Sequence, residues 1–129
     1  MATYFWIGLG SALGGIGRHL VSVWSVKHWG VVFPWGTLIV NVLGSFLIGL
    51  VSVWVGSERR LWLGIEMQQF LMIGFFGGFT TFSSFSLQNL NLLQTGEWQR
   101  ALANIFLSLT LCLFSVWLGW GLGKLIGFR

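Results

Sequence analysis

The stretch GFFGGFTTFSSF at residues 74–85 decides how this sequence folds. It lies inside an apolar run long enough to enter a membrane, yet it carries three glycines and a tight cluster of hydroxyl side chains. Glycine lowers helix stability, and Ser and Thr offer the backbone other hydrogen-bond partners. The stretch therefore predicts a helix that breaks at membrane depth. Such a break is tolerated where protein buries it or where it lines a wet path, so it often marks an ion or substrate site.

Three phenylalanines of this stretch, Phe79, Phe82 and Phe85, recur at every third residue. The spacing places them on one face of the helix that resumes after the break. A phenyl ring has a negative face and a positive edge. The ring edges of Phe82 and Phe85, together with Asn and hydroxyl donors, can replace part of the hydration shell of an anion. The alternative interpretation is an ordinary hydrophobic core stripe.

The composition places the chain in a membrane. It has 129 residues, of which 55% are hydrophobic and 8% charged, with a mean hydropathy of +0.81; a soluble domain averages roughly 25% charged residues. The net charge of +4 does not indicate nucleic-acid binding, because the seven Lys and Arg residues are scattered between apolar runs. They are better explained as loop charges and interfacial anchors, and the nine Trp residues fit the same interfaces. No Lys or Arg precedes Arg18, so we expect a retained first span rather than a cleaved signal peptide.

Four apolar runs reach the length of about 20 residues that a membrane helix needs. They cover residues 3–24, 33–55, 65–93 and 101–126, and the third contains the break. The runs are continuous rather than alternating, which argues against a β-barrel. The predicted fold class is an all-α membrane protein, a single domain over residues 1–129 with four transmembrane helices and a broken third helix.

Small residues recur along three of these runs, where they would let helices approach closely in lipid. They are Gly8, Gly10, Gly14, Gly15 and Gly17 in the first, Gly36, Gly44, Ser45 and Gly49 in the second, and Gly119, Gly121, Gly123 and Gly127 in the fourth. Packing within one chain and a subunit interface are both compatible with this pattern.

The charges give a weak orientation signal. One side of the membrane receives Arg59, Arg60, Lys124 and Arg129, and the other receives Lys27, Arg100 and Arg18. By the positive-inside rule, so small a difference in charge gives little preference for one orientation, so the chain can insert both ways. Four helices are also few to enclose a pore. The sequence therefore predicts an antiparallel homodimer with its twofold axis in the membrane plane.

Polar residues form two stripes within the apolar runs. Thr37, Asn41 and Ser45 are spaced four residues apart in the second run, and a similar stripe in the fourth comprises Asn104, Ser108, Cys112 and Ser115. Intramembrane polar residues usually face a bundle interior or a wet path. The alternative is hydrogen bonding between helices, worth about 0.6 kcal/mol per bond. Packing is favoured for single Ser and Thr residues, and function for Asn41 because it lies in the middle of a span.

The ionisable residues argue against an enzyme and against proton- or cation-coupled transport. The chain has no Asp, and Glu58, Glu66 and Glu97 all lie at run ends or in loops, whereas coupled transporters usually carry an acid within the membrane. The sequence shows no paired carboxylates, no Cys or His metal cluster and no Ser-His-Asp set. His19 and His28 lie near one end of a run and are expected at the interface.

Three motifs together resemble the Fluc (CrcB) fluoride channel family. Residues 77–85, GGFTTFSSF, resemble its GG-x-[TS]TFS-[TS]F signature. Residues 34–44, PWGTLIVNVLG, resemble its second-span motif with its Asn, and residues 14–18, GGIGR, are similar to its first-span pattern ending in Arg. The similarity covers nearly the whole chain. The three motifs together are a specific signal, whereas any one of them alone would be a weak one.

This resemblance implies a dual-topology, antiparallel homodimer with two fluoride pathways and a third span that crosses its partner at the dimer centre. It implies a structural sodium ion there, held by the backbone carbonyls of Gly77 and Thr80 from both subunits. By motif position, the implied pathway residues are Asn41, Phe82, Phe85, Thr81, Ser83, Ser84, Ser108 and Arg18, the last raising the local anion concentration at a vestibule. Gln88 stands where many members of the family carry Glu. In the fourth run, Cys112 and Val116 replace hydroxyl side chains found in some members, so the polar stripe there is expected to be shorter or drier.

The implied function is passive, selective fluoride export through the inner membrane of a bacterium, giving resistance to fluoride. The main alternative is a small drug-metabolite transporter, a class of similar size that needs a first-span Glu absent from this chain. A structural helper subunit without a pathway is a second alternative, and it predicts that Asn41 and the phenylalanines tolerate replacement. A membrane enzyme has the least support, and the expected partners are fluoride, membrane lipid and a second copy of the chain.

Overall fold

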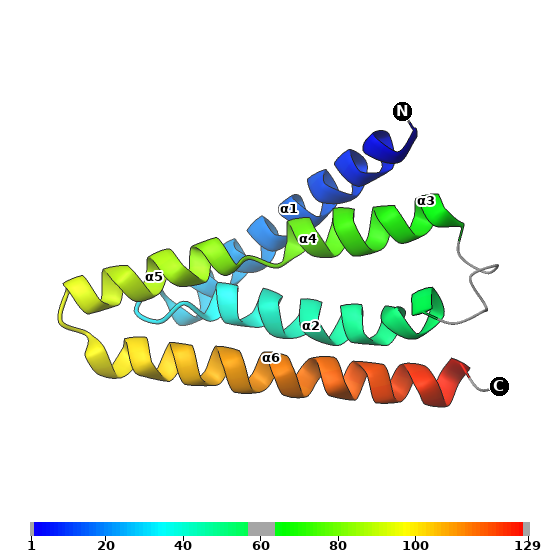
Figure 1. Ribbon diagram of the computed structural model, residues 1–129. Coiled ribbons are helices and arrows are strands. Elements are labelled where there is room, and N and C mark those ends of the chain that lie inside the picture. The colour runs from blue at the N-terminus through cyan, green and yellow to red at the C-terminus, as the bar shows by residue number, and fades with distance from the viewer. Residues whose placement is uncertain (1, 57–63, 128–129) are drawn as a thin grey trace.

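The computed structural model describes residues 2–56 and 64–127, and every element in these ranges is helical. In chain order the elements are α1 (Ala2–Trp29), α2 (Trp35–Gly56), α3 (Ile65–Gln68), η2 (Gln69–Phe75, a π-helix), α4 (Phe76–Phe79), α5 (Phe82–Gln94) and α6 (Trp98–Gly127) (Figure 1). The predicted loop charges Glu58, Arg59 and Arg60, and also Arg129, lie outside the described residues.

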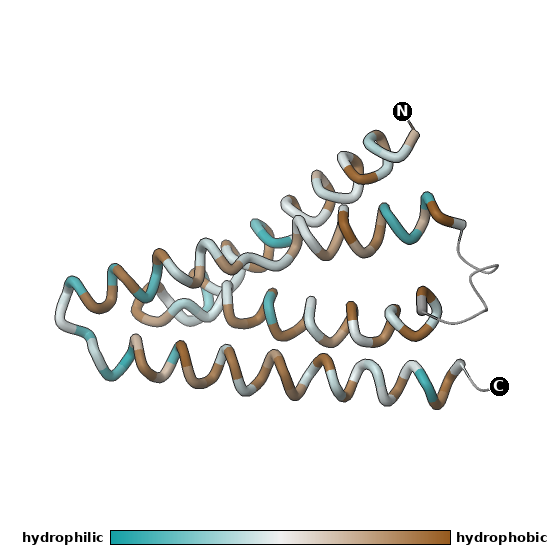
Figure 2. The backbone as a smooth tube through the Cα atoms, in the orientation of Figure 1, coloured by the Kyte–Doolittle hydropathy of each residue, from teal (hydrophilic) through white to brown (hydrophobic). Residues whose placement is uncertain are grey.

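Three stretches of the described helices are long and apolar enough to cross a membrane: Trp35–Val55, Ile65–Gln94 and Trp98–Gly127. Figure 2, which colours each residue by its hydropathy, shows many hydrophobic residues along these three stretches. Helix α1 has 28 residues but is not among these stretches, because its glycines and Arg18 lower its mean hydropathy. The protein is thus an all-α, multi-pass membrane protein with three to four long apolar helices.

The helices pack mainly as two pairs, α2 with α6 and α1 with the stretch from α3 to α5, which we call the third segment. Helices α2 and α6 lie side by side and point the same way, whereas α3 to α5 run in the opposite direction above them (Figure 1). Helix α1 packs on η2 and α4 and tilts away from the other helices toward its N-terminus. The first residues of α1 and the last residues of α6 lie at the same end of the bundle, as an even number of helical passes requires.

Glycines bring α2 and α6 into backbone contact. A methyl group placed on Gly119 would meet the carbonyl oxygen of Phe46, and one on Gly123 would lie 2.6 Å from that of Leu50. On the facing helix, a methyl group on Gly49 would meet the carbonyl oxygen of Val116. Apolar burial gives little driving force in lipid, so this close approach supplies the van der Waals contact that holds the two helices together.

A second glycine contact joins α1 to the third segment. Gly10 and Gly14 on α1 face Gly74 and Gly78, and the Cα of Gly74 would lie 3.0 Å from a methyl group on Gly10. On the other side, a methyl group on Gly78 would lie 2.5 Å from the carbonyl oxygen of Ser11. Packing within the chain therefore accounts for these glycines.

Other glycines face away from the rest of the described chain. Apart from its sequence neighbours and the nearby backbone of its own helix, a methyl group at any of these positions would have no described atom within 4 Å; they include Gly8, Gly15, Gly77 and Gly121. Packing within the chain thus explains the inward glycines, and the subunit interface stays a prediction for the outward ones. The outward set is available for contact with lipid or with another subunit.

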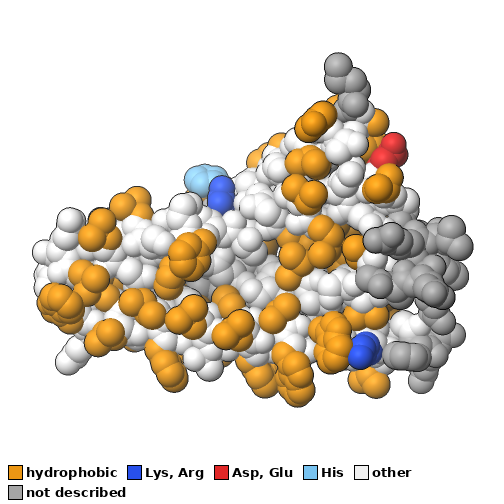
Figure 3. Space-filling view, viewed as in Figure 1, with side chains coloured by type: hydrophobic (Ala, Val, Ile, Leu, Met, Phe, Trp, Pro, Cys, Tyr) orange, Lys and Arg blue, Asp and Glu red, His pale blue; other side chains and the backbone are white. Residues whose placement is uncertain are grey.

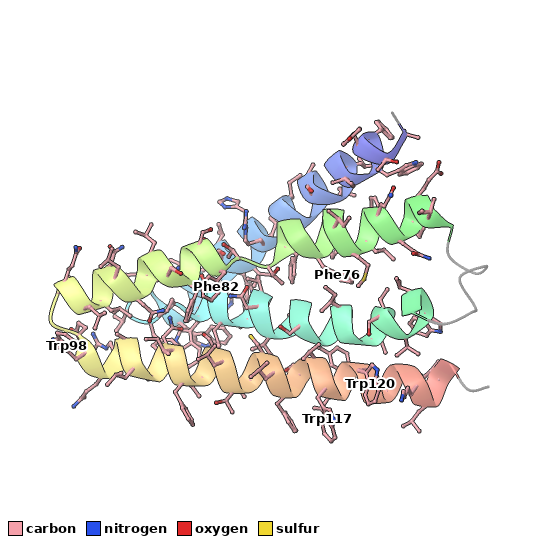
Figure 4. The ribbon with its side chains drawn as sticks, viewed as in Figure 1. Phe76, Phe82, Trp98, Trp117 and Trp120 are labelled. Atoms are coloured by element: carbon pink, nitrogen blue, oxygen red, sulfur yellow. The ribbon has the colours of Figure 1, made fainter. Side chains whose placement is uncertain are left out.

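The ends of three helices carry residues suited to starting or ending a helix. Gly30 (φ 75°) follows α1 and Gly96 (φ 79°) follows α5, and both adopt the left-handed conformation that glycine tolerates at a helix C-terminus. Pro34 precedes α2, where its fixed φ suits the start of a helix. Trp98 lies at one end of α6 and Trp120 near the other, where Trp120 stacks under the Lys124 ammonium at 3.9 Å (Figure 4). Trp rings at helix ends are typical of membrane interfaces.

The chain interrupts its helical path after Phe79. Helix α4 ends at that residue, and α5 begins at Phe82. The ring of Phe79 stacks on Phe75 at 5.7 Å, whereas Phe82 and Phe85 belong to the next helix. The prediction that Phe79, Phe82 and Phe85 share one face of a resumed helix is therefore wrong, because the interruption falls between the first of them and the other two.

Candidate functional site

Two residues with extended backbone separate α4 from α5. Thr80 has φ −81° and ψ 157°, and Thr81 has φ −153° and ψ 111°. The Thr80 N–H and hydroxyl both donate to the Phe76 carbonyl, at 3.0 Å and 2.8 Å, which ends α4 cleanly. Within lipid, the other backbone groups at such an interruption need partners from elsewhere in the protein.

Asn41 of α2 supplies those partners to Thr81. Its Oδ1 accepts from the Thr81 N–H at 2.8 Å, and its Nδ2 donates to the Thr81 carbonyl at 3.1 Å. The side-chain amide thus pairs with the extended residue as a neighbouring β-strand would. Satisfying both groups removes the cost of leaving them unpaired, about 1–3 kcal/mol each when buried.

The Thr81 hydroxyl caps the helix that follows. It accepts from the Ser84 N–H at 3.2 Å, as an N-cap side chain does. It also donates to the Ser84 hydroxyl at 3.0 Å and lies 3.2 Å from that of Ser83. The predicted hydroxyl cluster therefore exists around Thr81 and serves the start of α5.

A cavity of about 390 Å³ lies beside the interruption, between the third segment, α2 and α6. Its wall is mostly apolar, and its polar positions come from three elements: Asn41, Ser45, Thr80, Thr81, Ser108 and Cys112. Phe76, Phe82 and Phe85 supply its aromatic wall. Phe76 and Phe82 lie on the two sides of the interruption (Figure 4). Neutral donors and phenyl rings without a carboxylate suit an anion.

The two phenylalanines predicted to line a pathway differ in exposure. Phe85 is 8% exposed and belongs to the core of the chain, whereas Phe82 is 73% exposed. Their ring centroids are 5.3 Å apart with an interplanar angle of 42°. Phe82 thus borders the cavity while most of its ring is exposed. On the face of the molecule drawn in Figure 3, the coloured side chains are mostly hydrophobic and few are charged.

A second cavity, of about 340 Å³, lies at the junction of α1, α2 and α5. Thr37 lines it, so the stripe of Thr37, Asn41 and Ser45 borders both cavities. Among the described residues, Ser25 Oγ and Gln88 Oε1 are buried in this wall without a hydrogen-bond partner. Orphaned buried polar atoms next to a cavity indicate a place where water or an ion would bind.

A model of the family described as "CrcB-like protein, Camphor Resistance (CrcB)" matches residues 5–120. The chain belongs to the CrcB family. This confirms the resemblance found in the motifs, and the matched range includes the interruption, Asn41 and both cavities.

Named relatives of this CrcB chain cover nearly its whole length. A protein of Opitutus terrae named "Fluoride-specific ion channel FluC" is 53% identical over 119 residues, which is 92% of this chain and 90% of the relative. Proteins of the same name are 53% identical over 116 residues in Methylocella silvestris, covering 90% and 88%, and 46% identical over 119 residues in Paramagnetospirillum magneticum, covering 92% and 93%.

The structure brings most of the predicted site residues of this CrcB chain to the first cavity. Asn41, Phe82, Phe85, Thr81 and Ser108 line it, together with Gly77 and Thr80. Three predicted residues are not part of its wall: Ser84 is half-buried behind Thr81, Ser83 is exposed, and Arg18 is half-buried on α1. Of the departures from the family pattern, Cys112 lines the first cavity and Gln88 the second, whereas Val116 packs against Gly49 of α2.

Sequence reasoning missed one polar residue. Asn89 of α5 is buried and donates to the Phe85 carbonyl at 2.8 Å, while it accepts from Asn104 at 3.1 Å. The four-residue spacing of Phe85 and Asn89, together with a second Asn in the next span, could have indicated this contact.

The backbone at the interruption fits the sodium ion that the resemblance to CrcB proteins implies. In a continuous helix the Thr81 N–H would donate to the Gly77 carbonyl, but here it donates to Asn41. The Gly77 carbonyl is thereby released from its helical donor, and Gly77 itself is exposed. Carbonyl oxygens are hard ligands that suit a hard cation. In the described ranges, no group of three His, Cys, Asp or Glu side chains offers an alternative metal site.

Proposed function

We propose that this chain forms a channel that conducts fluoride selectively and passively across a bacterial inner membrane. The relatives at 43–53% identity are named fluoride-specific ion channels. The observation that carries the proposal is the pairing of Asn41 with Thr81 inside a cavity that phenyl rings and hydroxyls share. A channel needs no coupling acid and no catalytic group, whereas the drug-metabolite alternative requires an acid that the first helix lacks.

The cavity offers what a strongly hydrated anion requires. Fluoride loses its water only if several close donors replace it. The Asn41 amide has two N–H groups, and the bond to Thr81 uses one of them, which leaves the other for an ion. Ser108, Phe82 and Phe85 border the same space, and the positive edge of a phenyl ring can contact an anion there. We place the conduction path along the stripe of Asn41 and Thr37, from the first cavity to the second.

Export needs no energy source beyond the gradient. HF is neutral and crosses lipid when the outside is acidic, and it ionises in the near-neutral cytoplasm, where the anion is trapped. A membrane potential that is negative inside favours the exit of an anion by about 2.3 kcal/mol per 100 mV. A passive path is therefore sufficient for resistance to fluoride.

The functional unit that we propose is an antiparallel homodimer whose broken third spans cross at the centre. The exposed ring of Phe82, the outward-facing Gly77 and the open side of the first cavity support a partner subunit that completes the path. A sodium ion at this crossing would be held by the Gly77 and Thr80 carbonyls of both subunits. Arg18 would raise the anion concentration at a vestibule.

Dual topology predicts labelling of one position from both sides of the membrane. Gln99 is exposed at the start of α6 and accepts a reporter cysteine in a Cys112→Ser background. We expect an impermeant maleimide added outside sealed vesicles to label about half of the cysteine in the Gln99→Cys variant, and one enclosed inside to label the other half. The reason is that equal populations of the chain insert in each orientation. Labelling from one side only would contradict the antiparallel dimer.

Fluoride efflux from potassium-fluoride-loaded proteoliposomes, started with valinomycin, tests the pathway. We expect Phe82→Ile to slow this efflux at least about tenfold, since losing one ion contact of ~1.4 kcal/mol at the barrier has that effect. Phe106→Ile is the matched control, because Phe106 is an exposed phenylalanine of α6 outside the first cavity. Equal efflux from both variants would argue against a pathway at Phe82.

A further inference from the structure

Two buried asparagines link the wall of the first cavity to the backbone of α5. Asn104 of α6 is fully buried, and Asn89 of α5 is 6% exposed. The Ser108 hydroxyl donates to Asn104 Oδ1 at 3.4 Å, Asn104 Nδ2 donates to Asn89 Oδ1 at 3.1 Å, and Asn89 Nδ2 donates to the Phe85 carbonyl at 2.8 Å. These four groups form one continuous chain of hydrogen bonds, which we term the asparagine relay.

The direction of this relay is fixed at its Phe85 end. A backbone carbonyl can only accept, so Asn89 must turn its Nδ2 toward Phe85 and its Oδ1 toward Asn104. Asn104 must then present its own Nδ2 to Asn89, and its Oδ1 faces Ser108. The last step leaves Ser108 as the donor, so its proton points at Asn104 rather than into the cavity.

Of the three side chains that hydrogen-bond in the relay, only that of Ser108 belongs to a residue bordering the first cavity. Ser108 lines the first cavity, whereas Asn89 and Asn104 border neither the first nor the second. The Ser108–Asn104 bond is also the longest of the three, well beyond the usual 2.7–2.8 Å of an O–H···O bond, and is therefore weak. An anion in the cavity competes with Asn104 for one proton at small cost.

We propose that Asn89 and Asn104 are positioning residues that regulate how tightly Ser108 holds a passing anion, an inference that rests on the proposed fluoride path. Between ions, Asn104 Oδ1 accepts the Ser108 proton. When an anion arrives, the hydroxyl rotates toward it, and when the anion leaves, the hydroxyl rotates back and donates to Asn104 Oδ1 again, with the O–H bond intact throughout. Conduction requires sites that bind an ion strongly enough for entry and weakly enough for exit. Because Asn104 Oδ1 competes for the Ser108 hydroxyl, Ser108 binds the anion weakly enough for it to leave.

Removing the acceptor should therefore tighten binding. We expect Asn104→Ala to lower the fluoride concentration that gives half-maximal efflux roughly threefold, the size of one weak competing hydrogen bond, with a slower maximal rate. Asn89→Ala should shift it in the same direction, because Asn104 is then free to turn its Nδ2 toward Ser108. This second variant leaves Asn104 in place and keeps the test available if Asn104→Ala does not fold.

The double variant separates the relay from a packing role. In a Ser108→Ala background, Asn104→Ala should change half-saturation by less than about twofold, within the scatter of additive effects. In a Ser115→Ala background the full shift should persist, since Ser115 borders neither of the two cavities. A shift that survives in Ser108→Ala, or unchanged half-saturation in both asparagine variants, overturns the relay while wild-type efflux stands. Absence of wild-type fluoride efflux instead overturns the proposed function, and the relay's role falls with it.

Discussion

Asn41→Asp should stop fluoride efflux while leaving the protein folded. The carboxylate keeps an acceptor for the Thr81 N–H but loses the donor to the Thr81 carbonyl and the N–H group that remains for an ion. It also places a negative charge in the wall of the first cavity. Like charges about 4 Å apart repel by roughly 4 kcal/mol at an effective dielectric constant of ~20. A barrier raised by that amount slows conduction roughly a thousandfold.

Gln99→Glu is the control for this substitution, because it makes the same amide-to-acid change at an exposed position outside both cavities. Its efflux should match the wild type. Asn41→Leu adds a separate comparison, since it leaves both backbone groups of Thr81 unpaired and should lower the unfolding temperature as well as the efflux. Wild-type efflux from Asn41→Asp would remove Asn41 from the pathway.

Gly119→Ala should destabilise the folded protein more than any other single methyl group on α6. The added carbon would overlap the Phe46 carbonyl oxygen and lie 3.0 Å from the Leu50 nitrogen. These are backbone atoms, so the two helices must separate rather than a side chain rotate. Overpacking of this kind typically costs about 1–3 kcal/mol, and a rigid backbone neighbour puts this site at or above that range.

Gly121→Ala is the matched control two residues away. A methyl group at Gly121 has no described atom of another helix within 4 Å, and alanine stabilises a helix by up to about 1 kcal/mol over glycine. Thermal unfolding of the two variants in detergent should therefore shift in opposite directions from the wild type. Equal midpoints would mean that the contact between α2 and α6 does not limit stability.

Hydrophobic run length and turn residues were enough to predict the helices. The run 33–55 corresponds to α2 within two residues at each end, and the run 101–126 lies inside α6. The first helix extends to Trp29, five residues beyond the predicted end, because Lys27 and His28 are compatible with a helical last turn. His19 accordingly lies within α1 rather than near its end.

The site could be predicted in part. The hydroxyl-rich segment and Asn41 stand out as polar groups in apolar runs, and the fold brings Asn41 to Thr81. What the sequence could not provide is the pairing, since it depends on how α2 packs on the third segment. The relation of Phe79 to Phe82 was missed for a similar reason, because residue spacing does not reveal where the helix stops.

Wild-type efflux of fluoride and chloride from the same proteoliposome preparation tests the central claim most directly. With valinomycin present to carry potassium, the account predicts rapid release of fluoride and negligible release of chloride, because the first cavity combines neutral hydrogen-bond donors with phenyl rings. No fluoride release from folded protein, or equal release of both ions, would contradict a fluoride-selective channel.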